Sequence, residues 1–295
     1  MRKKTIVIFL ISMLVIPSII VSGEKINNEK VNTSVPDDDV PIWKVGDSWT
    51  YTISSFYVNY SYGGRKILMS GRIDDLKWIV TDITETTYVV SVTGVVSANY
   101  NIETPVGNLI LKLNGIVNPS SNTLRGTIIF NKANLHVVDV DATLFGISSV
   151  GFYDLPISIP LPIRISANGA LSVPFPLFDF PLHLLKIWNL PEIDLTGELN
   201  FGGIFGLIKI PMTLTRHYDF TLFAFTCLLK TPIEVDAGTF DAWHILSLIG
   251  GYYEYYYAPS VENIIKFDVN LANGGVQGEL KSFEFSTPHT NEKSA

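Results

Sequence analysis

The chain has 295 residues, of which 47% are hydrophobic, and a formal net charge of −7. An acidic protein repels the phosphate backbone, so this composition argues against nucleic acid as a partner. The single cysteine, Cys227, has no second thiol for an internal disulfide, so stability must come from a hydrophobic core, which a chain of this length can bury.

Residues 1–23 have the layout of a secretory signal peptide. A basic run at residues 2–4 precedes an apolar stretch from Thr5 to Val21, and small residues then precede Glu24. As a helix this stretch would span roughly 25 Å, less than the hydrocarbon core of about 30 Å. We therefore expect export to the cell surface or extracellular space, with an uncleaved N-terminal anchor as the alternative.

Residues 24–40 are polar and acidic, and end in the run Asp37-Asp38-Asp39 before Val40. This segment has too few large apolar residues to bury a core, so it predicts a disordered acidic stalk. Asn-x-Ser triplets occur at Asn32 and Asn59, and both are compatible with glycosylation of a surface protein.

Strand patterns begin after the stalk. Trp49, Tyr51 and Ile53 alternate with threonines, which is the period of a half-buried strand. Similar signals follow over residues 72–83, 87–96, 108–117, 124–130 and 136–144. They are too closely spaced for the crossover helices of a parallel sheet. The sequence therefore predicts an all-β, mainly antiparallel fold, with residues 41–150 forming a first β unit.

Residues 151–183 are rich in proline, which predicts a connecting segment that is mostly excluded from central strands. Its apolar residues indicate that it packs across a hydrophobic surface. A second β unit is expected over residues 184–287, followed by a disordered tail, 288–295. A faint similarity between residues 104–141 and 231–270 leaves open whether the two units form one domain or two.

The region from Thr231 to Phe285 is the most distinctive. After a turn at residues 236–239, an aromatic strand at residues 252–257 carries five tyrosines, which places rings on both of its faces. One interpretation is a sheet that is covered on both sides. The other is a groove for an apolar or carbohydrate ligand. The candidate ligand-binding residues are Trp49, Trp188, Phe240, Trp243, Tyr255 and Tyr257.

Patterns for catalysis or metal binding are missing from the sequence. No two of the five histidines are three to five residues apart, as zinc sites commonly require, and no G-x-S-x-G motif occurs. Asp139 and Asp141 fall on one face of a predicted strand, where two carboxylates could act as an acid/base pair or hold Ca²⁺, but a solvated strand face explains them better. We therefore expect no catalytic residues, no cofactor and no metal.

Three pieces of the chain carry a family resemblance: residues 43–51, W-K-V-G-D-S-W-T-Y; 236–245, D-A-G-T-F-D-A-W-H-I; and 255–266, Y-Y-Y-A-P-S-V-E-N-I-I-K. Together they resemble exported prokaryotic, often archaeal, proteins of unknown function. The second and third also resemble the DUF3108-type relatives of lipoprotein-carrier proteins. This resemblance implies one or two curved antiparallel half-barrels with an apolar concave face, which holds lipid acyl chains in the carriers. The chain lacks their lipid-anchoring cysteine, and its proline-rich segment is an addition.

The sequence thus predicts an exported, non-enzymatic β protein. It would bind a lipid or other apolar ligand, or a cell-envelope protein, through an aromatic-lined concave sheet. The alternatives are a structural or adhesive envelope protein without a small ligand and, third, a glycan-active enzyme. The last would need two carboxylates about 5–10 Å apart in an aromatic-flanked cleft.

Overall fold

A computed structural model of the chain describes residues 40–62, 64–106, 109–117, 123–152, 155–189, 193–203, 208–218, 224–247, 252–271 and 274–286. The predicted signal peptide, most of the predicted stalk with Asn32, and the predicted tail lie outside these residues. The described part contains strands and connecting turns and no helix, so no described helix is available to cross a membrane.

The structure confirms the predicted all-β, antiparallel fold. The described residues form one 15-stranded sheet. The strands are β1 (Ser48–Tyr62), β2 (Arg65–Ile83), β3 (Thr87–Val106), β4 (Leu109–Val117), β5 (Thr123–Asn131), β6 (Val137–Phe152), β7 (Leu155–Phe175), β8 (Ile187–Asn189), β9 (Ile193–Gly203), β10 (Ile208–Tyr218), β11 (Ala224–Val235), β12 (Gly238–Ser247), β13 (Tyr252–Ala258), β14 (Asn263–Leu271) and β15 (Gly274–Glu284).

The strand order is β10-β9-β7-β6-β4-β3-β2-β1-β15-β14-β13-β12-β11-β8, with β5 paired to β3 and β6. All the pairs are antiparallel, and the sheet is not closed into a barrel. Because β1 pairs with β15, the start and the end of the folded chain are neighbours. The two predicted β units therefore contribute to a single sheet.

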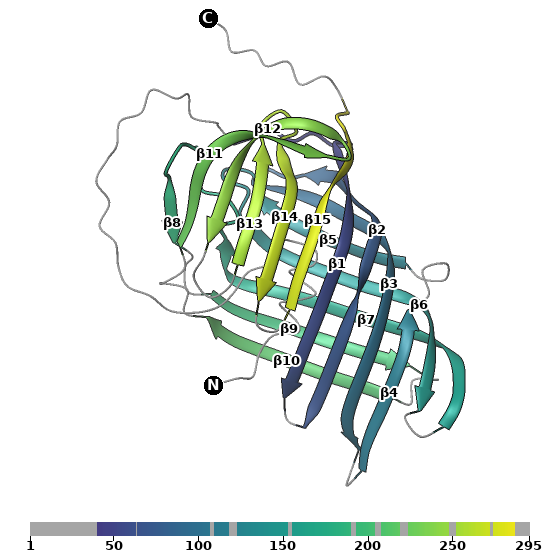
Figure 1. The fold of residues 1–295 in the computed structure, drawn as a ribbon. Helices are drawn as coiled ribbons and strands as arrows, with labels where there is room; N and C mark the ends of the chain where they lie inside the picture. The colour runs from purple at the N-terminus through teal and green to yellow at the C-terminus, as the bar shows by residue number, and fades with distance from the viewer. Residues whose placement is uncertain are drawn as a thin grey trace, which may run out of the picture.

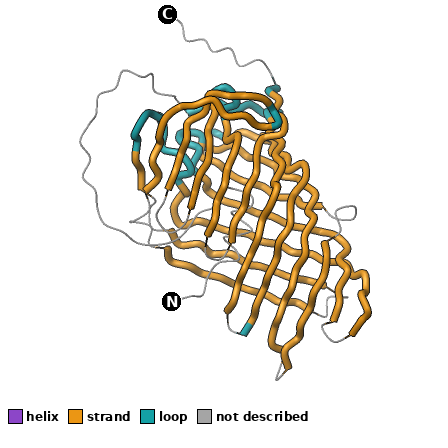
Figure 2. The backbone as a smooth tube through the Cα atoms, viewed as in Figure 1, coloured by secondary structure: helices purple, strands orange, loops and turns teal. Residues whose placement is uncertain are grey.

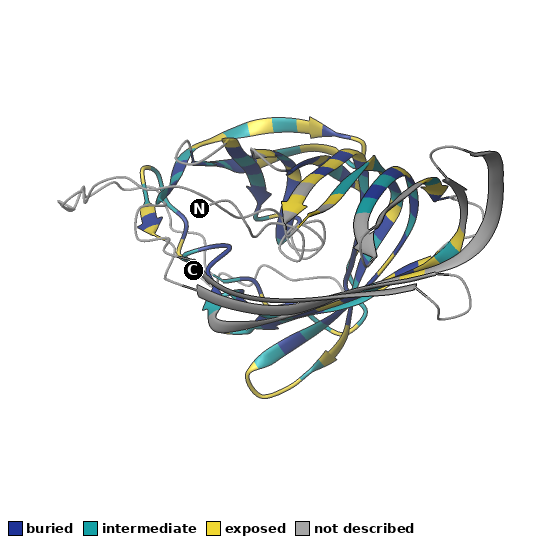
Figure 3. Cartoon of the chain, turned by 90° about the horizontal axis from the view of Figure 1, so that it is seen from below, coloured by how far each residue is buried: buried dark blue, intermediate teal, exposed yellow. Residues whose placement is uncertain are grey.

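The sheet is strongly curved. Strands β7, β9 and β10 cross behind β1, β2 and β3, and the C-terminal strands β11 to β15 arch over the upper end (Figure 1). The backbone trace shows the same two crossing layers, and its loops gather at the upper end (Figure 2). Seen from below, buried and exposed residues alternate along the strands (Figure 3). The core therefore lies on the concave side of the sheet.

The alternation of buried apolar residues with more exposed polar residues explains why these segments form strands. Trp49, Tyr51 and Ile53 on β1 are buried, as the sequence predicts, with 0%, 3% and 0% of their surfaces exposed. Their polar groups are satisfied across the sheet: Trp49 Nε1 donates to the Val261 carbonyl at 2.8 Å, and Tyr51 Oη to that of Ile264 at 3.0 Å. These hydrogen bonds tie the first strand to the chain's C-terminal part, in addition to the ladder with β15.

The expectation that proline keeps most of residues 151–183 out of central strands is wrong. Residues Leu155–Phe175 form β7, which pairs with both β6 and β9. The pairing with β9, however, covers only Ile163 to Leu171. Pro156, Pro160, Pro162 and Pro174 all lie outside that stretch, where β7 has at most one partner among the described strands. A proline is tolerated there because no second ladder needs its missing N–H.

The rest of the proline-rich region forms a strap, residues 176–186, between β7 and β8. Backbone hydrogen bonds join the strap to β11: the Leu185 N–H donates to Cys227 O, and the Cys227 N–H donates to Lys186 O, each at 2.8 Å. The Lys186 ammonium lies 3.2 Å from the Asp179 carboxylate. The prediction that part of this region packs on an apolar surface is therefore confirmed for the strap, whose Leu177, Phe178 and Leu182 are buried.

Candidate functional site

Five of the six predicted ligand-binding residues lie in the core. Trp49 is 0% exposed, Tyr255 and Tyr257 are each 1% exposed, and Trp188 and Trp243 are also buried. Phe240 is half-buried and packs edge-on against Phe283, with their ring centroids 5.8 Å apart. These rings do not face solvent directly, so any ligand contact by the buried five would require movement of what covers them.

The strap covers two of these rings. Phe178 packs edge-on against Tyr257 and Tyr255, with centroid distances of 5.0 and 6.1 Å. Phe180 packs against Tyr257 at 5.5 Å, and Tyr255 Oη donates a 2.7 Å hydrogen bond to the Leu177 carbonyl. The C-terminal part of the concave side is thus occupied by the chain itself.

The other predicted residues are divided between different clusters. Trp188 stacks on Phe225, which in turn meets the edge of Tyr255, so Trp188 joins the strap-covered group. Trp49 packs instead against Trp43, at a centroid distance of 4.9 Å. Trp243 pairs with Tyr257 in the ladder between β12 and β13. The structure therefore brings four of the six together and leaves Trp49 and Phe240 in separate aromatic clusters.

The tyrosine strand β13 presents rings on both faces, as predicted. Tyr253, Tyr255 and Tyr257 are buried on the core side, whereas Tyr252 is 38% exposed and Tyr256 is half-buried on the other. On that outer face Glu254 Oε2 accepts a 2.6 Å hydrogen bond from Tyr252, and Oε1 accepts one of 2.7 Å from Tyr256. These contacts make Glu254 the centre of a polar network.

His244 completes this network from β12. Its Nε2 lies 2.8 Å from Glu254 Oε1, and its ring stacks on Tyr256 with centroids 4.7 Å apart. Burial acts to raise the pKa of Glu254, but the hydrogen bonds from Tyr252 and Tyr256, together with His244, outweigh it and lower the pKa. The hydrogen bond to Glu254 raises the pKa of Tyr252 to about 12. The network therefore favours an ionised Glu254 beside two protonated phenols.

This network makes a testable contribution to stability. Because the pKa of Glu254 is lower in the folded than in the unfolded chain, the contribution is present above the unfolded value, about 4.3, and is lost as the pH falls through the folded value. We expect the unfolding free energy of Glu254→Gln to fall less steeply than that of the wild type between about pH 5 and 3. Urea unfolding across this range measures it. Glu234→Gln, which changes an exposed glutamate, is the control, and equal slopes for E254Q and wild type would contradict the network.

Apolar positions also align across β6, β7, β9 and β10. Val140, Ala142 and Leu144 on β6 are buried. The pairing register extends from each of them across the next three strands. The three resulting rows are Val140–Gly169–Gly197–Leu214, Ala142–Ala167–Leu199–Met212 and Leu144–Ile165–Phe201–Ile210. All twelve positions are apolar or glycine.

The rows between these apolar rows consist mostly of polar residues. The register aligns Asp141–Asn168–Glu198–Thr213 and Thr143–Ser166–Asn200–Pro211. Successive positions of a strand alternate between its two faces, so the apolar rows continue the register positions of the buried β6 residues, and the rows between them take the alternate positions. The apolar rows reach β10, the last strand in the order. The sequence reasoning missed them because it excluded most of the proline-rich segment from central strands.

A second feature is a depression of about 710 Å³ that is lined by residues of β1 to β4. Its lining residues are Tyr57, Val58, Asn59, Leu68, Met69, Ser70, Asn99, Tyr100, Asn101, Asn114, Gly115 and Ile116. The sequence reasoning identified Asn59 alone among them, as a glycosylation triplet. The other asparagines come from separate strands, and only the pairing register brings them together.

The carboxylates considered for glycan hydrolysis do not strengthen that alternative. Asp141 is exposed, and Asp139 is half-buried. Burial, with the charge of Asp141 as a smaller contribution, raises the pKa of Asp139. No group of three or more His, Cys, Asp or Glu side chains that could hold a metal ion occurs in the described residues. The expectations of no enzyme activity and no cofactor stay predictions.

Comparison of the chain with protein-family models, curated proteins and solved structures found no match. The resemblance to DUF3108-type proteins therefore stays an expectation.

Proposed function

We propose that this chain is an exported, non-enzymatic protein of the cell surface that binds an apolar ligand on the concave side of its sheet. The observation that supports the proposal best is the apolar face formed by aligned rows on β6, β7, β9 and β10. An elongated ligand such as a fatty acyl chain matches a face with no charged residue in three successive rows, because burying such a chain contributes about 0.8 kcal/mol per methylene.

The strap determines where the ligand would lie. Since Phe178 and Phe180 already pack on Tyr255 and Tyr257, the ligand would occupy the part of the concave side towards β10. The candidate residues Trp188, Trp243, Tyr255 and Tyr257 then close one end of the binding space together with the strap. Trp49 and Phe240 support the sheet from neighbouring clusters.

The test uses the purified full-length chain. We expect organic extraction and native mass spectrometry to find a co-purified lipid, and a fluorescent fatty acid to bind after delipidation. Leu199→Trp adds bulk to the apolar face without adding charge, and it should weaken binding of the probe at least about tenfold. Thr196→Trp is the matched control, because Thr196 pairs with Ala170 and Thr215 in a row of the opposite face.

The outcomes separate the proposal from its alternatives. Absence of both lipid and probe binding from a folded protein would overturn it and favour a structural or adhesive envelope protein. Equal probe binding by L199W and T196W would place the ligand elsewhere and would also contradict it. Circular dichroism of both variants verifies that the sheet has formed.

A further inference from the structure

The depression on the outer face of β1 to β4 is built from three neighbouring rows of the sheet. The register aligns Tyr57–Ser70–Asn99–Ile116, then Val58–Met69–Tyr100–Gly115, then Asn59–Leu68–Asn101–Asn114. In the middle row, Val58 and Tyr100 are only 6% and 5% exposed, so this row points to the core. The two flanking rows therefore point away from the core and form the sides of the depression, and the backbone of the middle row forms its floor.

The sides combine polar amides with apolar side chains, among them Leu68 and Ile116, and they are uncharged. They carry four carboxamides, from Asn59, Asn99, Asn101 and Asn114, and the hydroxyl of Ser70. Each carboxamide offers two N–H donors and an acceptor oxygen. None of the twelve lining residues carries a charge. Such a surface suits a neutral ligand with many hydroxyl groups better than an ion.

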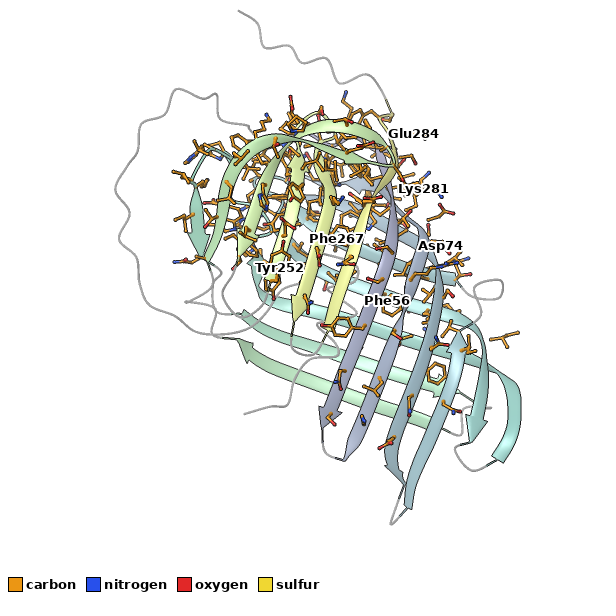
Figure 4. All side chains as sticks on the ribbon, viewed as in Figure 1. Phe56, Asp74, Tyr252, Phe267, Lys281 and Glu284 are labelled. Carbon is orange, nitrogen blue, oxygen red and sulfur yellow. The ribbon has the colours of Figure 1, made fainter. Side chains whose placement is uncertain are left out.

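An aromatic ring stands at one edge and is held in place. Tyr57 Oη donates a 2.8 Å hydrogen bond to Asn270 Oδ1 on β14. The ring lies over Gly275 of β15, where a Cβ atom would come within 2.5 Å of Cε1 of Tyr57. In Figure 4 this contact can be located between two labelled residues: Phe56, which precedes Tyr57 on β1, and Tyr252, which pairs with Asn270 across β13 and β14. Tyr57 is thus held at the β15 side of the depression, and it is 38% exposed.

One lining atom lacks the hydrogen bond that its burial demands. Asn101 Oδ1 is buried and has no hydrogen-bond partner in the part of the chain that the structure describes. A buried acceptor without a partner costs about 1–3 kcal/mol, so a ligand hydroxyl that donated to it, once the Asn101 side chain rotated towards the depression, would recover free energy on binding. The neighbouring Asn59 and Asn114 are exposed, and they could hydrogen-bond the same ligand from the two ends of the row.

We propose that this depression binds a neutral carbohydrate. Adjacent sugar hydroxyls each donate and accept, as the carboxamides do, and the C–H face of a sugar ring can pack on Tyr57. The proposal concerns the face opposite the proposed apolar site, so either can fail without the other.

The carbohydrate has two chemical sources. Asn59 opens the triplet Asn59-Tyr60-Ser61, and its side chain is exposed at the rim of the depression. The sugar would therefore be either the first residues of a glycan attached to Asn59 Nδ2 or a free saccharide. Both would meet the same amides.

The experiment distinguishes these sources. Intact mass and glycopeptide mapping of the full-length chain from its native host detect a glycan on Asn59. Saturation-transfer NMR with chitotriose, mannotriose and maltotriose detects free saccharides. The double variant Asn99→Ala/Asn114→Ala removes two exposed amides, and we expect it to lose at least about tenfold in affinity for the trisaccharide that binds. Thr93→Ala, at an exposed position elsewhere on β3, should leave the affinity unchanged.

Each possible result either supports or overturns the proposed carbohydrate site. Trisaccharide binding that is lost in the double variant and kept in T93A supports a site for free saccharide. A glycan on Asn59 whose protons show nuclear Overhauser contacts to the Asn99 and Asn114 side-chain amides supports the attached source. A folded chain with neither, or equal binding by the double variant and T93A, would overturn the proposal. Asn59→Gln tests the attached source, since it removes the acceptor amide of the triplet.

Discussion

Replacing Phe178 with alanine is expected to lower the free energy of unfolding by about 3–5 kcal/mol, the usual cost of removing a buried phenylalanine ring. Phe178 is 2% exposed and meets the rings of Tyr255, Tyr257 and Phe180. Without it, the strap would lose its main apolar contact with β13 and leave a cavity against the tyrosines. Chemical denaturation of the purified variant measures the loss.

Tyr255→Phe is the matched variant for this prediction. It keeps the ring that Phe178 packs on and removes only the hydroxyl that donates to the Leu177 carbonyl, so we expect a loss of about 1 kcal/mol. Hydrogen exchange would show whether the loss is local: the Leu185 and Cys227 amides, which bond between the strap region and β11, should exchange faster in Phe178→Ala. A change below about 1 kcal/mol in Phe178→Ala would mean that the strap is only loosely packed and that the predicted rings are accessible.

The strands could be predicted from the sequence, whereas the contacts of the strap that covers the tyrosine strand could not. Alternation of apolar and polar residues predicts the strands, because each strand has one core-facing side; Trp49, Tyr51 and Ile53 are buried accordingly. The same rule predicts both faces of the tyrosine strand. It cannot say what covers the buried face, because Phe178 is 77 residues before Tyr255 and its contact depends on the path of the whole sheet.

The prolines of residues 151–183 led to a wrong expectation, because their effect also depends on how the strands pair. A proline is excluded from a strand only where its missing N–H is needed by a neighbour. Strand β7 is longer than its partner β9, so the prolines at its ends have at most one neighbour among the described strands. From Leu155 to Ile165 every second residue is a leucine or isoleucine, which is the pattern of a strand. The sequence does not show how far a neighbouring strand extends along it, because the relative lengths of two paired strands depend on the whole sheet.

The asparagine-lined depression could not be predicted from the sequence. Asn59, Asn99, Asn101 and Asn114 lie on β1, β3 and β4, and a shift of one residue in any ladder would turn one of these side chains to the opposite face. The only local signal is the spacing of Asn99 and Asn101, which puts both on one face of a strand.

Replacing Asp47 with alanine is the second change for which we expect a large effect, a loss of about 2–3 kcal/mol in the free energy of unfolding. Asp47 is fully buried, in the turn before β1. Its Oδ2 accepts a 2.7 Å hydrogen bond from the Lys44 N–H, and its Oδ1 accepts bonds from Ser286 N–H and Oγ at 2.9 and 3.1 Å. One carboxylate thus joins the residues before the first strand to those after the last.

Ser286→Ala is the matched control, because it removes only the hydroxyl donor and leaves the Ser286 N–H bonded to Asp47; we expect it to cost less than about 1 kcal/mol. Urea unfolding of both variants gives the free energies. Hydrogen exchange should locate the effect at the Ser286 amide and at the Gly46 amide, which donates to the Val80 carbonyl. Because β1 and β15 meet in the middle of the strand order, loosening this junction weakens the link between the strap-covered C-terminal strands and the strands that carry both proposed sites. Equal stability of Asp47→Ala and Ser286→Ala would show that the Asp47 carboxylate does not stabilise this junction beyond the single hydrogen bond from the Ser286 hydroxyl.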